Sequence, residues 1–155
     1  MGVRIYLPAT MSDLERLADA RLDLTPRRAH AVTTALRREL PEDDDEELEF
    51  AAHLAAAADS LRLIAATAGA ARQRLVITAD VPDGIPVRAP DDDPASLVHL
   101  SAPIRREQVV CVHVDEPEAI SDGDAALRGD REAIERVGER VLLWYDVSEL
   151  DRIPR

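Results

Sequence analysis

Cysteine is nearly absent from this sequence, since Cys111 is the single one among 155 residues. One cysteine cannot form a disulfide within the chain, so nothing indicates an oxidising compartment. Long apolar segments are also lacking, because no run reaches the ~18 residues of a membrane-spanning helix and the N-terminus does not resemble a signal peptide. These absences predict a cytoplasmic protein that does not enter a membrane.

Lysine is missing as well, and aromatic residues make up only 3% of the chain. All 19 basic residues are therefore arginines, against 31 acidic residues, which gives a formal net charge of −12 at pH 7. This charge opposes binding to nucleic-acid phosphates and to anionic membranes, and no aromatic residues alternate with the arginines as a single-strand binding surface requires. We therefore expect neither nucleic acid nor a membrane as a partner.

Recognisable catalytic motifs are a third absence. The six glycines have neither the spacing of a phosphate-binding loop nor that of a dinucleotide fingerprint, and the sequence contains no nucleophile elbow or paired-cysteine zinc motif. Most nucleotide-dependent enzymes and hydrolases are disfavoured on this ground. The motifs by themselves predict no cofactor.

The composition that is present suits one globular domain over residues 1–155. Hydrophobic residues make up 46% of the chain and charged residues 32%. A chain of this length buries about two-thirds of the surface that it exposes when unfolded, which is enough for a single core. Because aromatic residues are scarce, this core must be mainly aliphatic.

The longest predicted element is a helix over residues 42–68. It begins with an acidic run, residues 43–47, which suits the positive end of the helix dipole. Its apolar residues recur at alternating spacings of four and three, so they lie on one helical face that we expect to pack in the core. On the opposite face we expect His53 to pair with Glu49. The residues of the predicted core face are Phe50, Leu54, Ala57, Leu61, Ile64 and Ala68.

The other segments predict an α+β fold, a mixed α/β sandwich in which the long helix and shorter helices pack on a mixed sheet of five or six strands. Residues 28–33 also fit a helical spacing, and residues 82–94 predict a long irregular loop. The apolar segments 75–81 and 141–147 predict interior strands, with Trp144 and Tyr145 in the core. Strands are expected at 3–8, 28–33, 75–81, 96–102, 109–115 and 141–147, and helices at 12–20, from 34, and within 116–137.

One arrangement of candidate metal ligands follows if residues 96–102 and 109–115 form an antiparallel hairpin. Matching the apolar faces of the two strands leaves four polar residues on the other face: His99, Cys111, His113 and Asp115. One register puts His99 directly across from His113, and such neighbours are close enough for two imidazoles to bind one metal ion, with Cys111 or Asp115 as a third ligand. The set would suit a divalent metal such as zinc and leave a coordination position open for catalysis.

The sequence is therefore compatible with two functions from different classes. The first is a non-enzymatic interaction or regulatory module that binds another protein, or a second copy of itself, through an acidic surface. The second is a small metal-dependent hydrolase that uses the predicted hairpin. We favour the first, because no His-x-His or His-Glu-x-x-His spacing reinforces the ligand set.

Short segments along nearly the whole chain resemble a family of small actinobacterial proteins known only as a domain of unknown function. The resemblance implies a bacterial, cytoplasmic, single-domain protein, and it implies no activity, cofactor or site residue. The segments that carry it are Tyr6–Thr10, Ala29–Thr33, Glu46–Ala52, Ala79–Pro82, Val112–Asp115 and Leu142–Tyr145.

Overall fold

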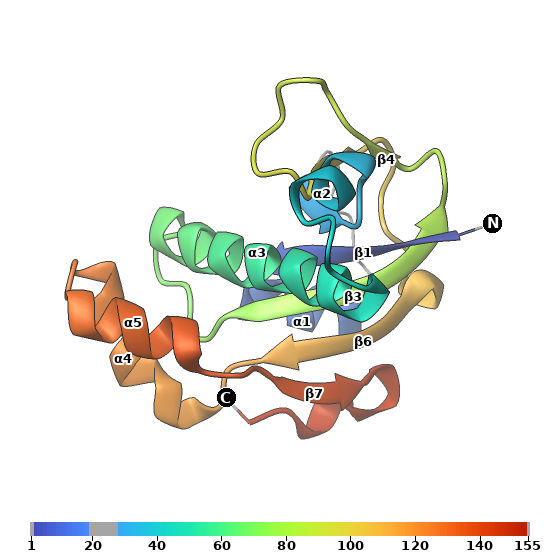
Figure 1. The fold of residues 1–155 in the computed structure, drawn as a ribbon. Helices are drawn as coiled ribbons and strands as arrows, with labels where there is room; N and C mark the ends of the chain where they lie inside the picture. Colours follow the sequence, from blue (N-terminus) through green and yellow to red (C-terminus); the bar gives the residue numbers. More distant parts are fainter. Residues whose placement is uncertain (1, 19–27, 155) are drawn as a thin grey trace.

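The computed structural model describes residues 2–18 and 28–154, and seven strands within these ranges form one sheet. The strand order is β4-β5-β2-β1-β3-β6-β7, and every neighbouring pair is antiparallel (Figure 1). The strands are β1 (Gly2–Ala9), β2 (Arg28–Ala31), β3 (Leu75–Pro82), β4 (Pro86–Val87), β5 (Leu97–Leu100), β6 (Val109–Val114) and β7 (Leu143–Asp146).

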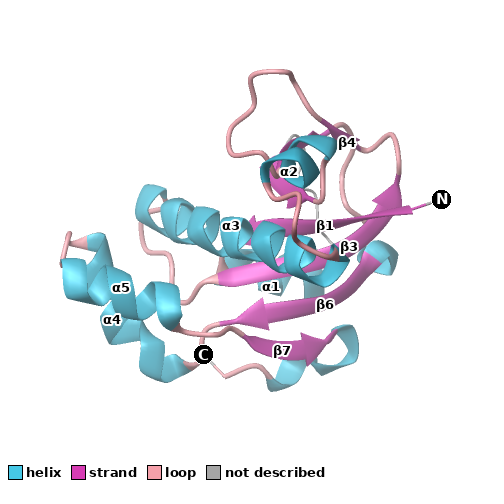
Figure 2. Cartoon of the chain, viewed as in Figure 1, coloured by secondary structure: helices cyan, strands magenta, loops and turns pink. Residues whose placement is uncertain are grey.

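Helices account for most of the remaining described residues (Figure 2). The predicted α+β class is confirmed, although the sheet is wholly antiparallel and gains a two-residue strand, β4, inside the predicted irregular loop. None of the helices in residues 2–18 and 28–154 combines the length and apolar character that a membrane crossing requires. The α-helices are α1 (Met11–Ala18), α2 (Thr34–Glu39), α3 (Asp45–Ala66), α4 (Ile120–Leu127) and α5 (Arg131–Glu139), and the 3-10 helices are η1 (Arg106–Gln108), η2 (Pro117–Ala119) and η3 (Val147–Arg152).

The two faces of the sheet are covered differently. On one face α1 and η3 close over a large aliphatic cluster that includes Ile5, Leu7 and Ile77. On the other face α3 contacts β1, β2 and β3, and a smaller cluster forms around Tyr6 and Val76. Figure 1 shows α3 crossing in front of β1 and β3, while β6 and β7 have no helix in front of them. The sheet is therefore only partly covered on the α3 side.

Helix α3 begins where the acidic run predicts. Asp44 caps it, because its carboxylate accepts a hydrogen bond from the Glu47 backbone N–H at 2.9 Å while the Glu47 side chain accepts from the Asp44 N–H at 3.3 Å. These reciprocal bonds satisfy two of the backbone donors that a helix leaves unpaired at its start. The helix spans Asp45–Ala66, slightly shorter than the predicted 42–68.

The face of α3 that packs on the sheet is the predicted one only in part, since Ala57 and Ile64 are buried as expected. Phe50 and Leu54 are exposed, whereas the small residues Ala52 and Ala56 are fully buried. Both rows have helical spacing, so periodicity alone cannot choose between them. The alanine row packs because small side chains let the helix lie close to the sheet. The buried residues of α3 are Leu48, Ala52, Ala56, Ala57, Asp59, Ser60 and Ile64.

The position of the last strand is also different from the expectation. Segment 141–147 was predicted to be interior, but β7 is at the edge of the sheet and pairs only with β6 among the described strands. The short strand at Arg28–Ala31 and the helix beginning at Thr34 are confirmed, and the Thr33 hydroxyl accepts from the Leu36 N–H at 3.0 Å to cap that helix. The predicted helix 12–20 is α1 as far as Ala18, and its last two residues lie outside the described ranges.

Candidate functional site

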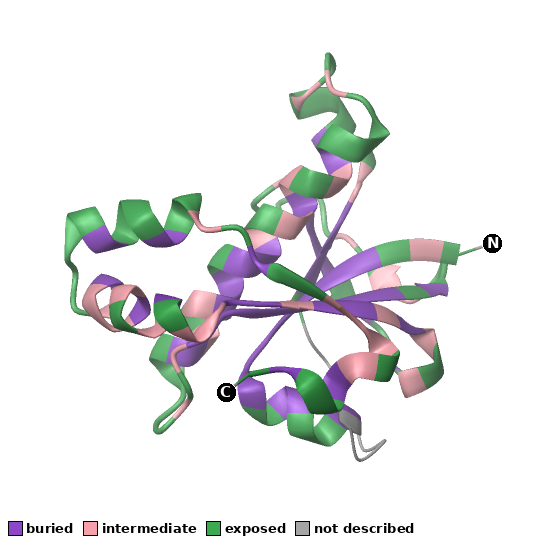
Figure 3. Ribbon diagram, turned by 90° about the horizontal axis from the view of Figure 1, so that it is seen from below, coloured by how far each residue is buried: buried purple, intermediate pink, exposed green. Residues whose placement is uncertain are grey.

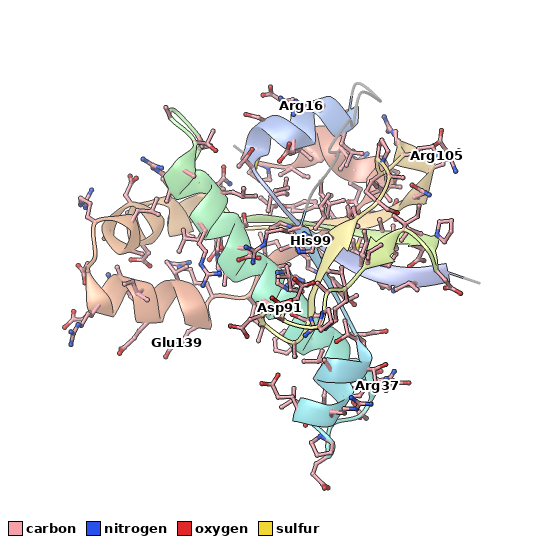
Figure 4. The ribbon with its side chains drawn as sticks, turned by 90° about the horizontal axis from the view of Figure 1, so that it is seen from above. Arg16, Arg37, Asp91, His99, Arg105 and Glu139 are labelled. Atoms are coloured by element: carbon pink, nitrogen blue, oxygen red, sulfur yellow. The ribbon has the colours of Figure 1, made fainter. Side chains whose placement is uncertain are left out.

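The hairpin on which the predicted metal site rests is not formed. β5 pairs with β2 and β4, β6 pairs with β3 and β7, and β2, β1 and β3 lie between the two strands. His99 is an exposed residue of β5 (Figure 4) whose Nε2 lies 3.3 Å from a carboxylate oxygen of Asp92. His113 lies on β6, across from Val76 on one side and Trp144 on the other. Three strands therefore separate the two histidines, and they do not form the predicted cross-strand pair.

The other candidate ligands have different neighbours. Cys111 is buried on β6, across from Thr78. Asp115 is also buried, and its two carboxylate oxygens accept three hydrogen bonds from Arg74, each of 2.9 Å. In residues 2–18 and 28–154, no three His, Cys, Asp or Glu residues are placed to bind one metal ion. The prediction of a metal site at His99, Cys111, His113 and Asp115 thus loses its geometric basis.

A buried Ser-His-Asp network, which the sequence did not indicate, joins three segments of the chain. Nε2 of His30 on β2 lies 2.6 Å from Oδ2 of Asp59 on α3, and its Nδ1 lies 2.7 Å from the hydroxyl of Ser96, just before β5. Arg28 and Arg62 also contact the Asp59 carboxylate, at 3.5 and 2.7 Å. Burial raises the pKa of Asp59, but hydrogen bonding with His30 and the charge of Arg28 outweigh it and keep the pKa below its ordinary value.

These contacts fix the direction of the hydrogen bonds. An ionised carboxylate can only accept, so Nε2 of His30 donates to Asp59. The components match those of a serine hydrolase, with the roles of the two ring nitrogens exchanged. However, Ser96 is 2% exposed and His30 is 0% exposed, so a substrate has no access to the serine hydroxyl. The geometry indicates a structural network that ties α3 to β2 and β5.

A second histidine cluster also lies beneath α3, on the same face of the sheet but nearer the β7 edge. The ring of His53 contacts three other rings, with centroid distances of 4.6 Å to His113, 6.0 Å to Tyr6 and 6.2 Å to Phe50. The sequence predicted that His53 would pair with Glu49 on the polar face of the helix, but its ring packs against this aromatic group. Burial lowers the pKa of His53 to about 4, and the charges of His113 and Arg74 act in the same direction.

This cluster is less completely hydrogen-bonded than the first. Burial also lowers the pKa of His113. Its Nδ1 atom, like the hydroxyl of Thr78 on the neighbouring strand, is buried without a hydrogen-bond partner in residues 2–18 and 28–154. Such groups are uncommon in folded proteins, because an unpaired polar atom keeps the cost of losing its water. The hydrogen bonding of this cluster is therefore less complete than that of the Ser-His-Asp network.

Large apolar side chains are exposed directly beside this cluster. Phe50 is 55% exposed, Leu54 46%, Val141 79% and Trp144 58%. The first three border a small hollow of about 60 Å³ between α3 and the chain that leads into β7. Trp144 faces the same side, because it is the cross-strand neighbour of His113, whose ring contacts α3. We call these four residues the α3–β7 patch, and Figure 3 shows the exposed part of β7 in green.

A larger cleft, of about 650 Å³, lies at the opposite end of the sheet. It is bordered by β2, α2 and the segment around β4, and its charged lining residues are Arg38, Asp83 and Arg88. The Arg88 guanidinium is already bound to the backbone carbonyls of Asp92, Pro94 and Leu97. Among the described residues of this lining there is no His, Cys or Ser, Asp83 is the single carboxylate, and the hydroxyl of Thr33 is already used in capping α2.

Comparison with known proteins identifies the chain at the family level. A family model described as a family of unknown function (DUF6912) matches residues 3–153, which is nearly the whole chain. The protein belongs to DUF6912. No curated protein and no solved structure matches it. Because membership of DUF6912 carries no activity, function has to be argued from the site itself.

Proposed function

We propose that this DUF6912 protein is a cytoplasmic bacterial interaction module, acting as one domain without catalysis, and that it binds another protein through the α3–β7 patch. The observation that supports this most is the exposure of Phe50, Leu54, Val141 and Trp144 on one surface. Contiguous exposed apolar side chains rimmed by polar ones are typical of protein-binding sites. Trp in particular is enriched among the residues that dominate binding energy.

The energetics favour a partner over permanent exposure. Burying one large apolar side chain is worth about 1.5–3 kcal/mol, so four of them offer a substantial driving force for association. Part of this is spent on the loss of translational and rotational freedom when two proteins associate. The patch also contains an aromatic residue from each element, Phe50 and Trp144, which provide large contact areas at small entropic cost.

Covalent capture in living cells tests the proposal. A photocrosslinking amino acid is placed at position 54 on the patch and, as the matched control, at position 87 on β4, where Val87 is equally apolar and 51% exposed at the other edge of the sheet. We expect adducts from position 54 and none from position 87. The mass of an adduct separates a different protein from a second copy of this chain. No adduct from position 54, or the same adducts from both positions, would contradict the proposal.

A further inference from the structure

We infer that the partner segment is a cationic amphipathic helix, packed beside α3 over β6 and β7. This inference rests on the proposed function, and it specifies the shape and charge of what the α3–β7 patch binds.

The helical layer formed by α3 does not extend over β6 and β7. α3 contacts β1, β2 and β3, and no described helix lies over β6 and β7 on that face (Figure 1). Strands in a sheet are about 4.8 Å apart, and the axes of helices packed in one layer are about 8–10 Å apart. A second helix beside α3 would therefore lie about two strands away from it, over β6 and β7. A docked helix would extend the α3 layer across the rest of the sheet.

The side chains that border this space are apolar on both sides. Phe50 and Leu54 are one helical turn apart on the flank of α3, and Trp144 projects from β7 on the same face of the sheet. Val141 borders the hollow at one end. A helix with apolar residues at spacings of three and four would contact both rows at once, as in other helix-in-groove complexes.

The charge at the rim selects a basic partner. Glu46 precedes Phe50 by one helical turn, Glu49 is adjacent to it, Glu139 borders the hollow, and Asp146 follows Trp144 on β7. The arginines at this surface are already paired: Arg4, which lies near Glu49, with Asp80, Arg74 with buried Asp115, and Arg140 with Glu116 and Asp122. The rim is therefore acidic, and the chain as a whole carries −12. Complementary charge on the partner would speed and orient docking.

Two other occupants fit less well. A second copy would bring an identical acidic rim and another net charge of −12 against the first. A partner strand added to β7 would find a short edge, because β7 has four residues and the Asp146 N–H already donates to the Glu149 carboxylate at 3.1 Å. An arginine-rich or lysine-rich amphipathic helix satisfies both the apolar and the charge pattern.

The single tryptophan makes the inference directly measurable. The probe is a synthetic peptide of about 18 residues with leucines at helical spacing and arginines elsewhere, long enough to cover the patch at 1.5 Å per residue. Its controls are the same peptide with glutamates in place of arginines, and an arginine peptide of the same composition with the leucines scrambled. We expect the arginine helix to shift Trp144 emission to shorter wavelength with saturation, and to bind at least tenfold more tightly than either control.

Protein variants test the location. The double change Phe50→Ser with Leu54→Ser should weaken binding at least tenfold, whereas Val87→Ser at the opposite edge should leave it unchanged, with circular dichroism confirming that both fold. Equal binding of the arginine and glutamate helices, or no loss in the double variant, would overturn the inference. If the arginine helix fails to bind while crosslinking at position 54 still captures a protein, the helix inference is wrong and the proposed function stands. If both fail, both are wrong.

Discussion

The two histidine clusters of this protein show how the same residue type serves different purposes in one sheet. His30 is fully buried and both of its ring nitrogens are paired, with Ser96 and with Asp59. His53 and His113 are partly exposed, contact each other ring to ring, and leave Nδ1 of His113 without a partner among the described residues. The fully paired cluster holds three segments together, whereas the incompletely paired one lies under the exposed α3–β7 patch. We therefore associate the first with stability and the second with binding.

The largest effect should come from breaking the paired cluster. Asp59→Ala leaves Nε2 of His30 without its buried acceptor and removes the carboxylate that Arg28 and Arg62 contact among the described residues. Removing one partner from a buried ionic network is costly, so we expect the free energy of unfolding to fall by about 3 kcal/mol. Urea denaturation at pH 7 measures it. The matched control is Asp92→Ala, which removes the carboxylate beside exposed His99. Equal losses of unfolding free energy in the two variants would show that the buried network contributes no more than an exposed ion pair.

The second cluster should make stability depend on pH. The pKa of His53 in the folded protein is about 4, below its ordinary 6.5, so the unfolded chain binds more protons as pH falls between these values. Stability is therefore fully present above pH 6.5 and is lost as the pH falls towards 4; from pH 7 to 5 we expect a loss of about 1–2 kcal/mol, allowing for partial exposure. His113, whose pKa is also lowered, adds in the same direction.

Two variants separate this contribution from general acid effects. His53→Gln cannot titrate and should remove most of the loss between pH 7 and 5, whereas Val87→Ser, an exposed substitution that changes no titratable group, should leave the loss unchanged. Chemical denaturation at both pH values provides the measurement. An undiminished loss in His53→Gln would mean that this cluster does not cause the pH dependence.

The smallest effect on stability should come from the patch itself. Trp144→Ser is expected to change the free energy of unfolding by less than about 0.5 kcal/mol, since 58% of Trp144 is exposed. Leu142→Ala, two residues earlier but buried, should cost about 2–3 kcal/mol. The crosslinking yield at position 54 should show the opposite ranking, with a larger fall in Trp144→Ser than in Leu142→Ala. A large stability loss in Trp144→Ser would make this residue part of the core, as the sequence first suggested.

Several elements could be predicted because their signals are local. The acidic run and its capping residues predicted the start of α3, the apolar alternation predicted β1, and the near-continuous apolar segment Leu75–Val81 forms all of β3 but its last residue. Neither histidine cluster could be predicted. His30, Asp59 and Ser96 come from separate segments, and no spacing along the chain links them. The hairpin prediction failed because strands that are consecutive in the sequence can pair elsewhere when the chain crosses the sheet between them.

The sequence by itself determined the α+β class, most helix and strand positions, the aliphatic core and the acidic charge, because each depends on composition or on periodicity within a few residues. Only the tertiary structure decided which face of α3 is buried, that β7 forms an edge, and that Phe50, Leu54 and Trp144 are exposed together. Two rows of residues on α3 have similar helical spacing, so either could pack on the sheet. Strand order is set by contacts between distant segments. The candidate binding surface arises from these non-local choices.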